Sequence, residues 1–393
     1  MSTHIGIGLS QDLDPQKAAR EAAQKAKEGL KGKTIDAALI FSSAHYDPGK
    51  TLPVAHASLE KTKLVGCSTS GLMHSNRIVR HGILIAAIHS ESIKFETGRV
   101  SHLDLQKGRE GGRELAKSTI TDFSPKHRKL LLFFADGLLH DLSDFAAGVK
   151  EELENALSVV GLGSIDDLHF HRTFQFFDDK FTVKGASSIL IGDRPTLALS
   201  CRHGWHPLGR PRTVDKTDGH IIKKIDGRPA IEIYRDYLEN ESDTFNLNPV
   251  GQINVRYPLG VRQNGHKEYI LKNVFQVLDD GSLVCQDKVT EGTQVHIMIG
   301  GKDSCMLAAQ EAVAEIENQL AGQTPNLILV VQSVARQKVL GRAAASELRL
   351  IHERLGKDIP LIGVTSYGEI FSPFDIHEQK VPLLNESLMI ISI

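Results

Sequence analysis

The chain has 393 residues, enough for two or three domains with well-buried cores. Its 46 lysines and arginines nearly balance its 48 aspartates and glutamates, so the net charge of −2 gives no electrostatic basis for binding nucleic acid or an anionic membrane. The sequence has no secretory signal and no apolar run long enough to span a bilayer, and its four cysteines are far apart without a Cys-x-x-Cys pair. These features predict a cytoplasmic protein without a disulfide framework or a zinc site.

Along the first half of the chain, apolar runs alternate with stretches of helical periodicity. Continuous or alternating apolar residues predict strands at 5–9, 37–41, 64–67, 82–89, 93–100, 130–135, 159–163, 169–177, 181–191 and 197–201. Apolar residues at helical spacing predict helices at 15–30, 54–60, 108–120 and 142–156. The basic stretch at 202–212 is short, and we interpret it as a solvated turn.

The second half begins with a short unit and a connection. A strand at 220–225 is followed by a turn and a helix at 229–238, and residues 240–266 are rich in Asn, Gly and Pro, which predicts an extended connection. The remaining predicted elements are a hairpin at 267–289 around Asp280 and Gly281, strands at 295–299, 327–331, 359–363 and 388–391, and helices at 306–320 and 341–355.

Two stretches share an uncommon form, a buried strand that ends in a glycine-bracketed loop with hydroxyl residues. They are KLVGCSTSG at 63–71 and IPLIGVTSYGE at 359–369. Three longer segments, 5–89, 104–192 and 295–392, also share one order of elements, and internal duplication explains this better than chance recurrence in an α/β protein. We therefore predict an α/β fold of two domains with internally repeated β-α-β-α-β units and mixed sheets flanked by helices. Because ligands bind at the carboxyl ends of strands in such sheets, the glycine loops are the candidate site.

Several motifs, in the same order along both halves, resemble those of the FIST family. They lie at 65–71, 134–137, 159–161, 204–209, 225–230, 257–261, 280–281, 291–292, 363–370 and 385–388, together with Arg336. The resemblance implies a FIST N domain at 1–228 followed by a FIST C domain at 229–393. This sequence departs from the family's pattern at three places. Leu72 replaces an acidic residue, 333–335 lack a cysteine, and Leu162 interrupts a glycine pair.

The resemblance implies a sensory role in bacterial signal transduction. The expected ligand is an amino acid or similar small metabolite bound in a cleft between the domains. Binding of this ligand would be signalled to a separate protein such as a histidine kinase or cyclase. A haem-binding nitric oxide sensor of the same family is the first alternative, so haem is the one possible cofactor, and an uncharacterised enzyme is the second.

The candidate ligand contacts come from the two glycine loops and one arginine. Arg336 and Glu369 would clamp the two charged ends of an amino acid, or else would pair with each other. Ser68 and Thr69 would offer hydroxyls to a carboxylate, or else would satisfy their own turn. The full set is Gly66, Ser68, Thr69, Gly71, Arg336, Thr365, Tyr367, Gly368 and Glu369.

The other motifs give weaker support for catalysis, nucleotide binding or metal binding. GCSTS at 66–70 is not a G-x-S-x-G nucleophile elbow, and no base is assignable, so we predict no catalytic residue. The loop at 299–304 resembles the phosphate loop of ATP pyrophosphatases, but we interpret Asp303 and Ser304 as a helix cap. His169 with His171, and His203 with His206, lack a metal-binding or haem-attachment spacing, so we predict no metal and assign no haem ligand.

Overall fold

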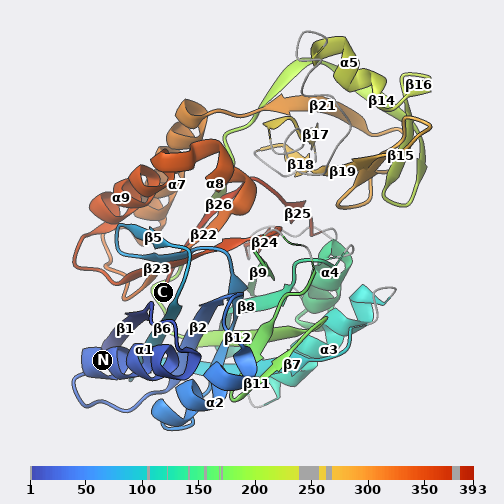
Figure 1. The fold of residues 1–393 in the computed structure, drawn as a ribbon. Helices are drawn as coiled ribbons and strands as arrows, with labels where there is room; N and C mark the ends of the chain where they lie inside the picture. The colour runs from blue at the N-terminus through green and yellow to red at the C-terminus, as the bar shows by residue number, and fades with distance from the viewer. Residues whose placement is uncertain are drawn as a thin grey trace.

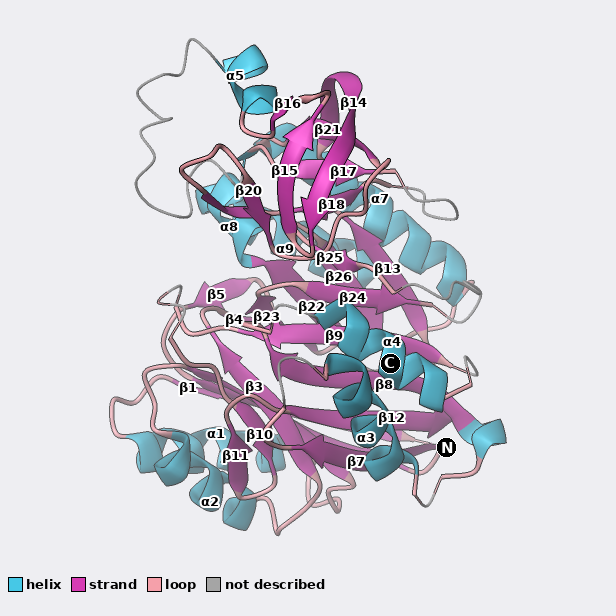
Figure 2. Ribbon diagram, turned by 90° about the vertical axis from the view of Figure 1, so that its right-hand side faces the viewer, coloured by secondary structure: helices cyan, strands magenta, loops and turns pink. Residues whose placement is uncertain are grey.

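A computed structural model of the chain describes residues 2–103, 107–121, 123–139, 142–154, 157–167, 169, 171–238, 256–262, 268–373 and 381–393. Three six-stranded sheets form the body of the protein, with helices on their outer faces (Figures 1 and 2). A fourth, eight-stranded sheet lies at one end, beyond the third six-stranded sheet (Figure 1). The predicted α/β fold is confirmed.

Each six-stranded sheet has the same plan. The first runs in the order β1 (Thr3–Ser10), β6 (Ile83–Ser90), β2 (Ala37–Ser43), β3 (Leu64–Thr69), β10 (Gln175–Phe177), β11 (Lys180–Thr182). The second runs β7 (Ile93–Val100), β12 (Ala186–Asp193), β8 (Arg128–Asp136), β9 (Ser158–Ser164), β24 (Glu369–Ser372), β25 (Leu383–Leu384). The third runs β13 (Ala198–Arg202), β26 (Leu388–Ser392), β22 (Ile328–Ser333), β23 (Leu361–Ser366), β4 (Leu72–His74), β5 (Arg77–Val79).

The repeat is visible in the pairing of these strands. The two middle strands of each sheet are parallel, and the strand beside them on each side is antiparallel. One backbone hydrogen bond also recurs between the end of a middle strand and the start of the return strand. It joins Ser43 N to Gly82 O, Asp136 N to Gly185 O, and Ser333 N to Ser387 O. The predicted internal repeats are therefore confirmed, although the second starts at β7 and not at residue 104, and the third starts at β13 and not at residue 295.

The sheets exchange hairpins. β4, from the first repeat, pairs with β23 of the third; β10, from the second, pairs with β3 of the first; and β24, from the third, pairs with β9 of the second. Each repeat therefore completes the sheet of another. Because β4 and β24 cross between the two halves, neither half contains all the strands of its own sheets.

The middle strands read as continuous apolar runs because both of their faces are buried. Their inner faces form one core shared by the three sheets, which includes Leu39, Leu132 and Leu329 at matching places. Their outer faces are covered by α1 (Pro15–Gly29) and α2 (Pro48–Ser58), by α3 (Gly108–Ile120) and α4 (Leu142–Glu152), and by α7 (Lys302–Leu320) and α9 (Ala344–Leu355). Apolar surface removed from water in this way stabilises a fold by ~25 cal/mol per Å².

Some predicted elements differ in their bounds. The helix expected at 54–60 begins at Pro48 because Asp47 caps it by accepting from Gly49 N. The helix expected at 341–355 is preceded by α8 (Val334–Leu340) and a 3₁₀ turn (Gly341–Ala343). The strand expected at 169–177 is only β10, and most of the connection expected at 240–266 lies outside the described residues.

The eight-stranded sheet is antiparallel throughout its described pairs. Its order is β18 (Ile270–Lys272), β17 (Leu259–Val261), β21 (Gln294–Ile299), β14 (His206–Asp218), β15 (Ile221–Ile225), β20 (Leu283–Cys285), β19 (Val274–Val277), with β16 (Arg228–Pro229) beside β15. The expected domain boundary at 228–229 falls inside the β15–β16 hairpin, so this sheet takes strands from both sides of that boundary.

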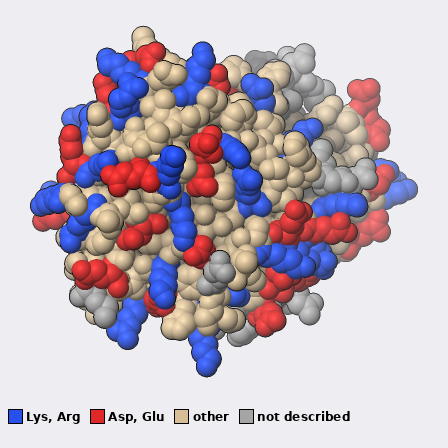
Figure 3. Space-filling model, turned by 90° about the horizontal axis from the view of Figure 1, so that it is seen from below, with Lys and Arg blue, Asp and Glu red and all other residues tan. Residues whose placement is uncertain are grey.

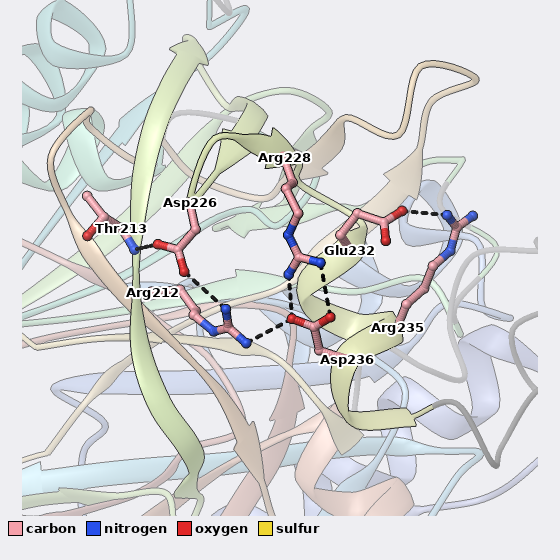
Figure 4. A network of polar contacts seen from close by, with 7 residues as sticks. All are labelled: Arg212, Thr213, Asp226, Arg228, Glu232, Arg235 and Asp236. Carbon is pink, nitrogen blue, oxygen red and sulfur yellow. Dashed lines mark hydrogen bonds and ion pairs between the residues drawn. The ribbon is translucent and has the colours of Figure 1, made fainter.

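An ion-pair network joins this sheet to α5 (Glu232–Leu238) (Figure 4). Arg212 of β14 donates to Asp226 at 3.1 Å and to Asp236 of α5 at 2.8 Å, and Arg228 donates to the same Asp236. The stretch predicted as a solvated turn at 202–212 is thus strand, with Arg212 tied into this network.

Charges elsewhere are interspersed. On the face seen from below, lysines and arginines alternate with aspartates and glutamates, and no large field of one sign is visible (Figure 3). None of the described helices has the length and apolar character needed to cross a bilayer.

Candidate ligand-binding site

The loops that follow β3, β9 and β23 meet at the centre of the three sheets. Thr69 Oγ1 donates to Thr365 O at 2.7 Å, and Thr365 N donates to Gly71 O at 2.9 Å. Tyr367 N donates to Gly163 O and Gly163 N donates to Gly368 O, each at 2.9 Å. The glycine loops of both halves therefore lie side by side, held by backbone hydrogen bonds.

In the first glycine loop, the candidate residues are occupied by contacts within the protein. Ser68 Oγ donates to Ile165 O at 3.1 Å and accepts from Phe174 N at 3.0 Å, and both Ser68 and Thr69 are buried. A Cβ at Gly66 would lie 1.7 Å from Ile40 O, and one at Gly71 would lie 2.4 Å from Thr365 Oγ1. These contacts correspond to the structural alternative, in which the loop binds neighbouring chain segments and not a ligand.

Arg336 requires a correction. It lies in α8 and not in a loop, its side chain is 0% exposed, and it donates to Glu347 of α9 at 2.6 and 2.9 Å. Its remaining donors reach His203 O and Cys305 O. Neither the ligand clamp nor the alternative pair with Glu369 forms, because Glu347 provides a closer carboxylate that the sequence did not reveal.

Glu369 is also fully buried, at the start of β24. Its carboxyl accepts from Ser366 Oγ and, at 2.7 Å, from Ser387 Oγ. Burial raises the pKa of Glu369 to about 7, against the opposing effect of the two serine hydroxyls. Thr365 and Gly368 belong to the same tight loop, and the ring of Tyr367 stacks on Phe275 of β19 at 6.2 Å.

A pocket of about 440 Å³ opens beside Glu369, and Ser387 belongs to its wall. Its lining comes from β13 and α7 of the third repeat, from β18 of the antiparallel sheet, and from β24 and β25, and residues 199–203 and 268–271 both belong to it. Its apolar wall includes Leu199, Ile270, Leu271, Phe371 and Leu384. Its polar wall includes Ser200, Arg202, His203, Glu268, Glu315 and Asn385.

The charged centre of this pocket is Arg202. Its guanidinium donates to Glu315 of α7 and lies 3.9 Å from Glu268, while its buried Nε has no hydrogen-bond partner among the described residues. Ser200 Oγ donates to Glu315 at 2.8 Å, and His203 N donates to Glu268 at 2.9 Å. Burial raises the pKa of Glu268 above its ordinary value and lowers the pKa of His203 to about 3, so that this imidazole stays neutral.

A second pocket, of about 560 Å³, lies at the opposite ends of the strands. Asp36 and Lys63 in its wall come directly before β2 and β3, and Lys63 pairs with Glu96 at 2.8 Å. Ligands of helix-covered sheets bind at the carboxyl ends of strands, which favours the pocket at Arg202.

The other motifs of the sequence are structural where they are described. Ser304 Oγ accepts from Gly301 N at 3.1 Å, as expected of a helix cap and not of a phosphate loop. His169 and His171 are exposed, with ring centroids 6.5 Å apart. Across the described ranges, no group of three or more His, Cys, Asp or Glu residues is arranged to hold a metal ion.

Sequence reasoning missed Arg202, Glu268 and Glu315. These residues are far apart along the chain, and they meet only because β13 joins the third sheet while β18 joins the antiparallel sheet. The one available signal was Arg202 directly after an apolar strand, at its carboxyl end.

These features define a two-part α/β protein that encloses a small charged pocket. The chain belongs to the FIST family: a FIST N domain matches residues 36–228 and a FIST C domain matches residues 230–372. Domains of this family are associated with sensory signal transduction.

Relatives of similar length are uncharacterized proteins. One from Mycobacterium tuberculosis is 26% identical over 378 residues, covering 93% of this chain and 94% of the relative. One from Mycobacterium bovis is 25% identical over 382 residues, covering 93% of each. Among solved structures, a cyanuric acid hydrolase aligns over 100% of both chains with a TM-score of 0.37 and 8% identity, which is too distant to support an inference about chemistry.

Proposed function

We propose that this chain is a cytoplasmic sensory protein that binds an amino acid or similar small metabolite in the pocket around Arg202. The observation that carries the proposal is one guanidinium between two carboxylates, Glu268 and Glu315, on the wall of a 440 Å³ pocket. A guanidinium offers a fork of donors to a ligand carboxylate, and glutamates accept from a ligand ammonium group. Arg202 thus takes the role that the sequence analysis predicted for Arg336.

Ligand binding would act on the junction between the two parts of the molecule. Residues 199–203 and 268–271 both line the pocket, so a ligand that contacts both stabilises one arrangement of β13 and α7 against the antiparallel sheet. The signal is the increased population of that arrangement, and a separate protein such as a histidine kinase or cyclase recognises it.

The test is a thermal-shift screen of the full chain against amino acids and small carboxylates, followed by calorimetric titration of any compound that stabilises it. A ligand at a hundred times its Kd stabilises the folded state by about 2.7 kcal/mol. We expect Arg202→Gln to weaken binding about ten- to hundredfold, as for loss of a charged hydrogen bond.

Arg354→Gln is the matched control, because Arg354 of α9 forms an exposed ion pair with Glu317 and neither residue lines the pocket. It should bind like the wild type. Equal affinity of the Arg202→Gln variant, or no stabilising compound in the screen, contradicts the proposal. A Soret band after expression with haem would instead support the haem-sensor alternative, and turnover of a bound compound would support the enzyme alternative.

A further inference from the structure

Behind the pocket wall lies a carboxyl group without a partner. Glu386 is 0% exposed, and neither of its oxygens accepts a hydrogen bond from a described residue. It sits between Asn385 and Ser387, which both belong to the pocket wall. Its backbone has φ of 54°, a conformation that non-glycine residues rarely adopt and that tends to be retained at functional sites.

A second acceptor without a hydrogen-bond donor belongs to Asn273. Asn273, between β18 and β19, is buried, and its Oδ1 also has no hydrogen-bond partner in the described part of the chain. Its amide is close enough to Glu386 to oppose the effect of burial and of Glu369, which together raise the pKa of Glu386. These two buried side chains thus carry three acceptor oxygens that accept no hydrogen bond from a described residue.

Two cationic side chains in this region already form ion pairs with other residues. Arg336 is committed to Glu347, and Lys272, next to Asn273, is committed to Asp287, both inside the protein. Other ionisable neighbours of Glu386 are Glu369, Cys305 and the phenols of Tyr234 and Tyr367; the pKa of each phenol is raised by burial and further by Glu386. A buried carboxylate left without a partner is costly, so this position favours a group that brings donors and positive charge.

We propose that Glu386 and Asn273 bind an ammonium group. A primary ammonium carries three donors, which match Glu386 Oε1, Glu386 Oε2 and Asn273 Oδ1 in number. A divalent metal fits less well, since calcium takes six to eight oxygen ligands.

The ammonium group has two possible sources. It is the amine end of a ligand whose carboxylate lies on Arg202, in which case the inference rests on the proposed function, or it is a free ammonium ion, in which case it does not. In both cases Glu386 becomes a specificity-determining residue that links β26 to the antiparallel sheet.

The experiment uses the full chain, with ammonium chloride and methylammonium chloride as probes and choline chloride at equal ionic strength as reference. Both probes are expected to raise the melting temperature above the choline value. Glu386→Gln keeps the shape of the side chain and removes its charge, so it should weaken the response at least tenfold and raise the melting temperature without any probe. Asn273→Ala should weaken the response as well, which provides a second test should the first variant fold poorly.

Glu311→Gln on the exposed face of α7 is the control and should respond like the wild type. Absence of any response to both probes in the wild type, or an unchanged response in Glu386→Gln, overturns the inference. If a metabolite from the screen binds, competition by ammonium chloride assigns the site to its amine end, and independent binding assigns it to the free ion. Binding of carboxylates without any amine response would leave the proposed function intact and refute this inference alone.

Discussion

At the scale of single residues, burial decides the chemistry of Glu369. Among the described residues its carboxyl is hydrogen-bonded by Ser366 and Ser387 and forms no ion pair, so burial favours the neutral form inside the protein. The sequence analysis predicted that Glu369 is a ligand contact, whereas its side chain is buried. Its burial follows from the donation of β24 to the second sheet, which local sequence does not reveal.

We expect the stability of the protein to depend on pH through Glu369. Its pKa of about 7 in the folded state lies above its ordinary value of 4.5, so its contribution is fully present below pH 4.5 and is lost as pH rises through 7. The free energy of unfolding should therefore decrease across this window, by a few kcal/mol at most. Urea denaturation at a series of pH values measures the slope.

Glu369→Gln should reduce this slope, and part of it should remain because burial also raises the pKa of Glu268 and of Glu386. The exposed Glu311→Gln variant should retain it. A wild-type slope in the Glu369→Gln variant would show that Glu369 is ionised in the folded protein.

At the scale of elements, Arg336 joins four parts of the third repeat. From α8 it reaches Glu347 of α9, the carbonyl of Cys305 in α7, and the carbonyl of His203 between β13 and β14. The β13–β14 connection carries the chain into the antiparallel sheet. Arg336 therefore fixes the helices against the segment that forms one wall of the pocket.

Arg336→Ala should lower the free energy of unfolding by about 3–5 kcal/mol, because it leaves the Glu347 carboxylate buried and unpaired. Replacing both partners with apolar residues, as in Arg336→Met with Glu347→Leu, should recover most of that loss. The exposed Arg354→Ala variant should lose no more than about 1 kcal/mol. Denaturant unfolding compares the three, and an Arg336→Ala variant as stable as Arg354→Ala would contradict this account.

Long elements could be predicted from sequence, and short exchanged ones could not. The middle strands β2, β8 and β22 are continuous apolar runs, the helices α1, α3 and α7 have apolar residues at helical spacing, and all of them lie where the sequence indicated. The hairpins that hold the sheets together are strands of two to four residues, such as β4 and β24, too short to show a period. The partners of Arg336 and Arg202 depend on those pairings, so the repeat was predictable while the site was not.

At the scale of the whole molecule, hairpin exchange makes the three repeats one unit. The glycine loops at their centre are bonded to each other, and the pocket lies instead where the third repeat meets the antiparallel sheet. This sheet is inserted in the chain between β13 and α7, and both of these elements contribute residues to the pocket wall. A ligand there is placed to couple the inserted sheet to the rigid body.

The most direct test of that account is hydrogen–deuterium exchange of the full chain with and without the compound that stabilises it best. We predict added protection in residues 199–203 and 268–271, on the two walls of the pocket, and no change in residues 66–71 of the first glycine loop. Protection confined to the glycine loop, or to the pocket around Asp36 and Lys63, would contradict the placement of the site at Arg202.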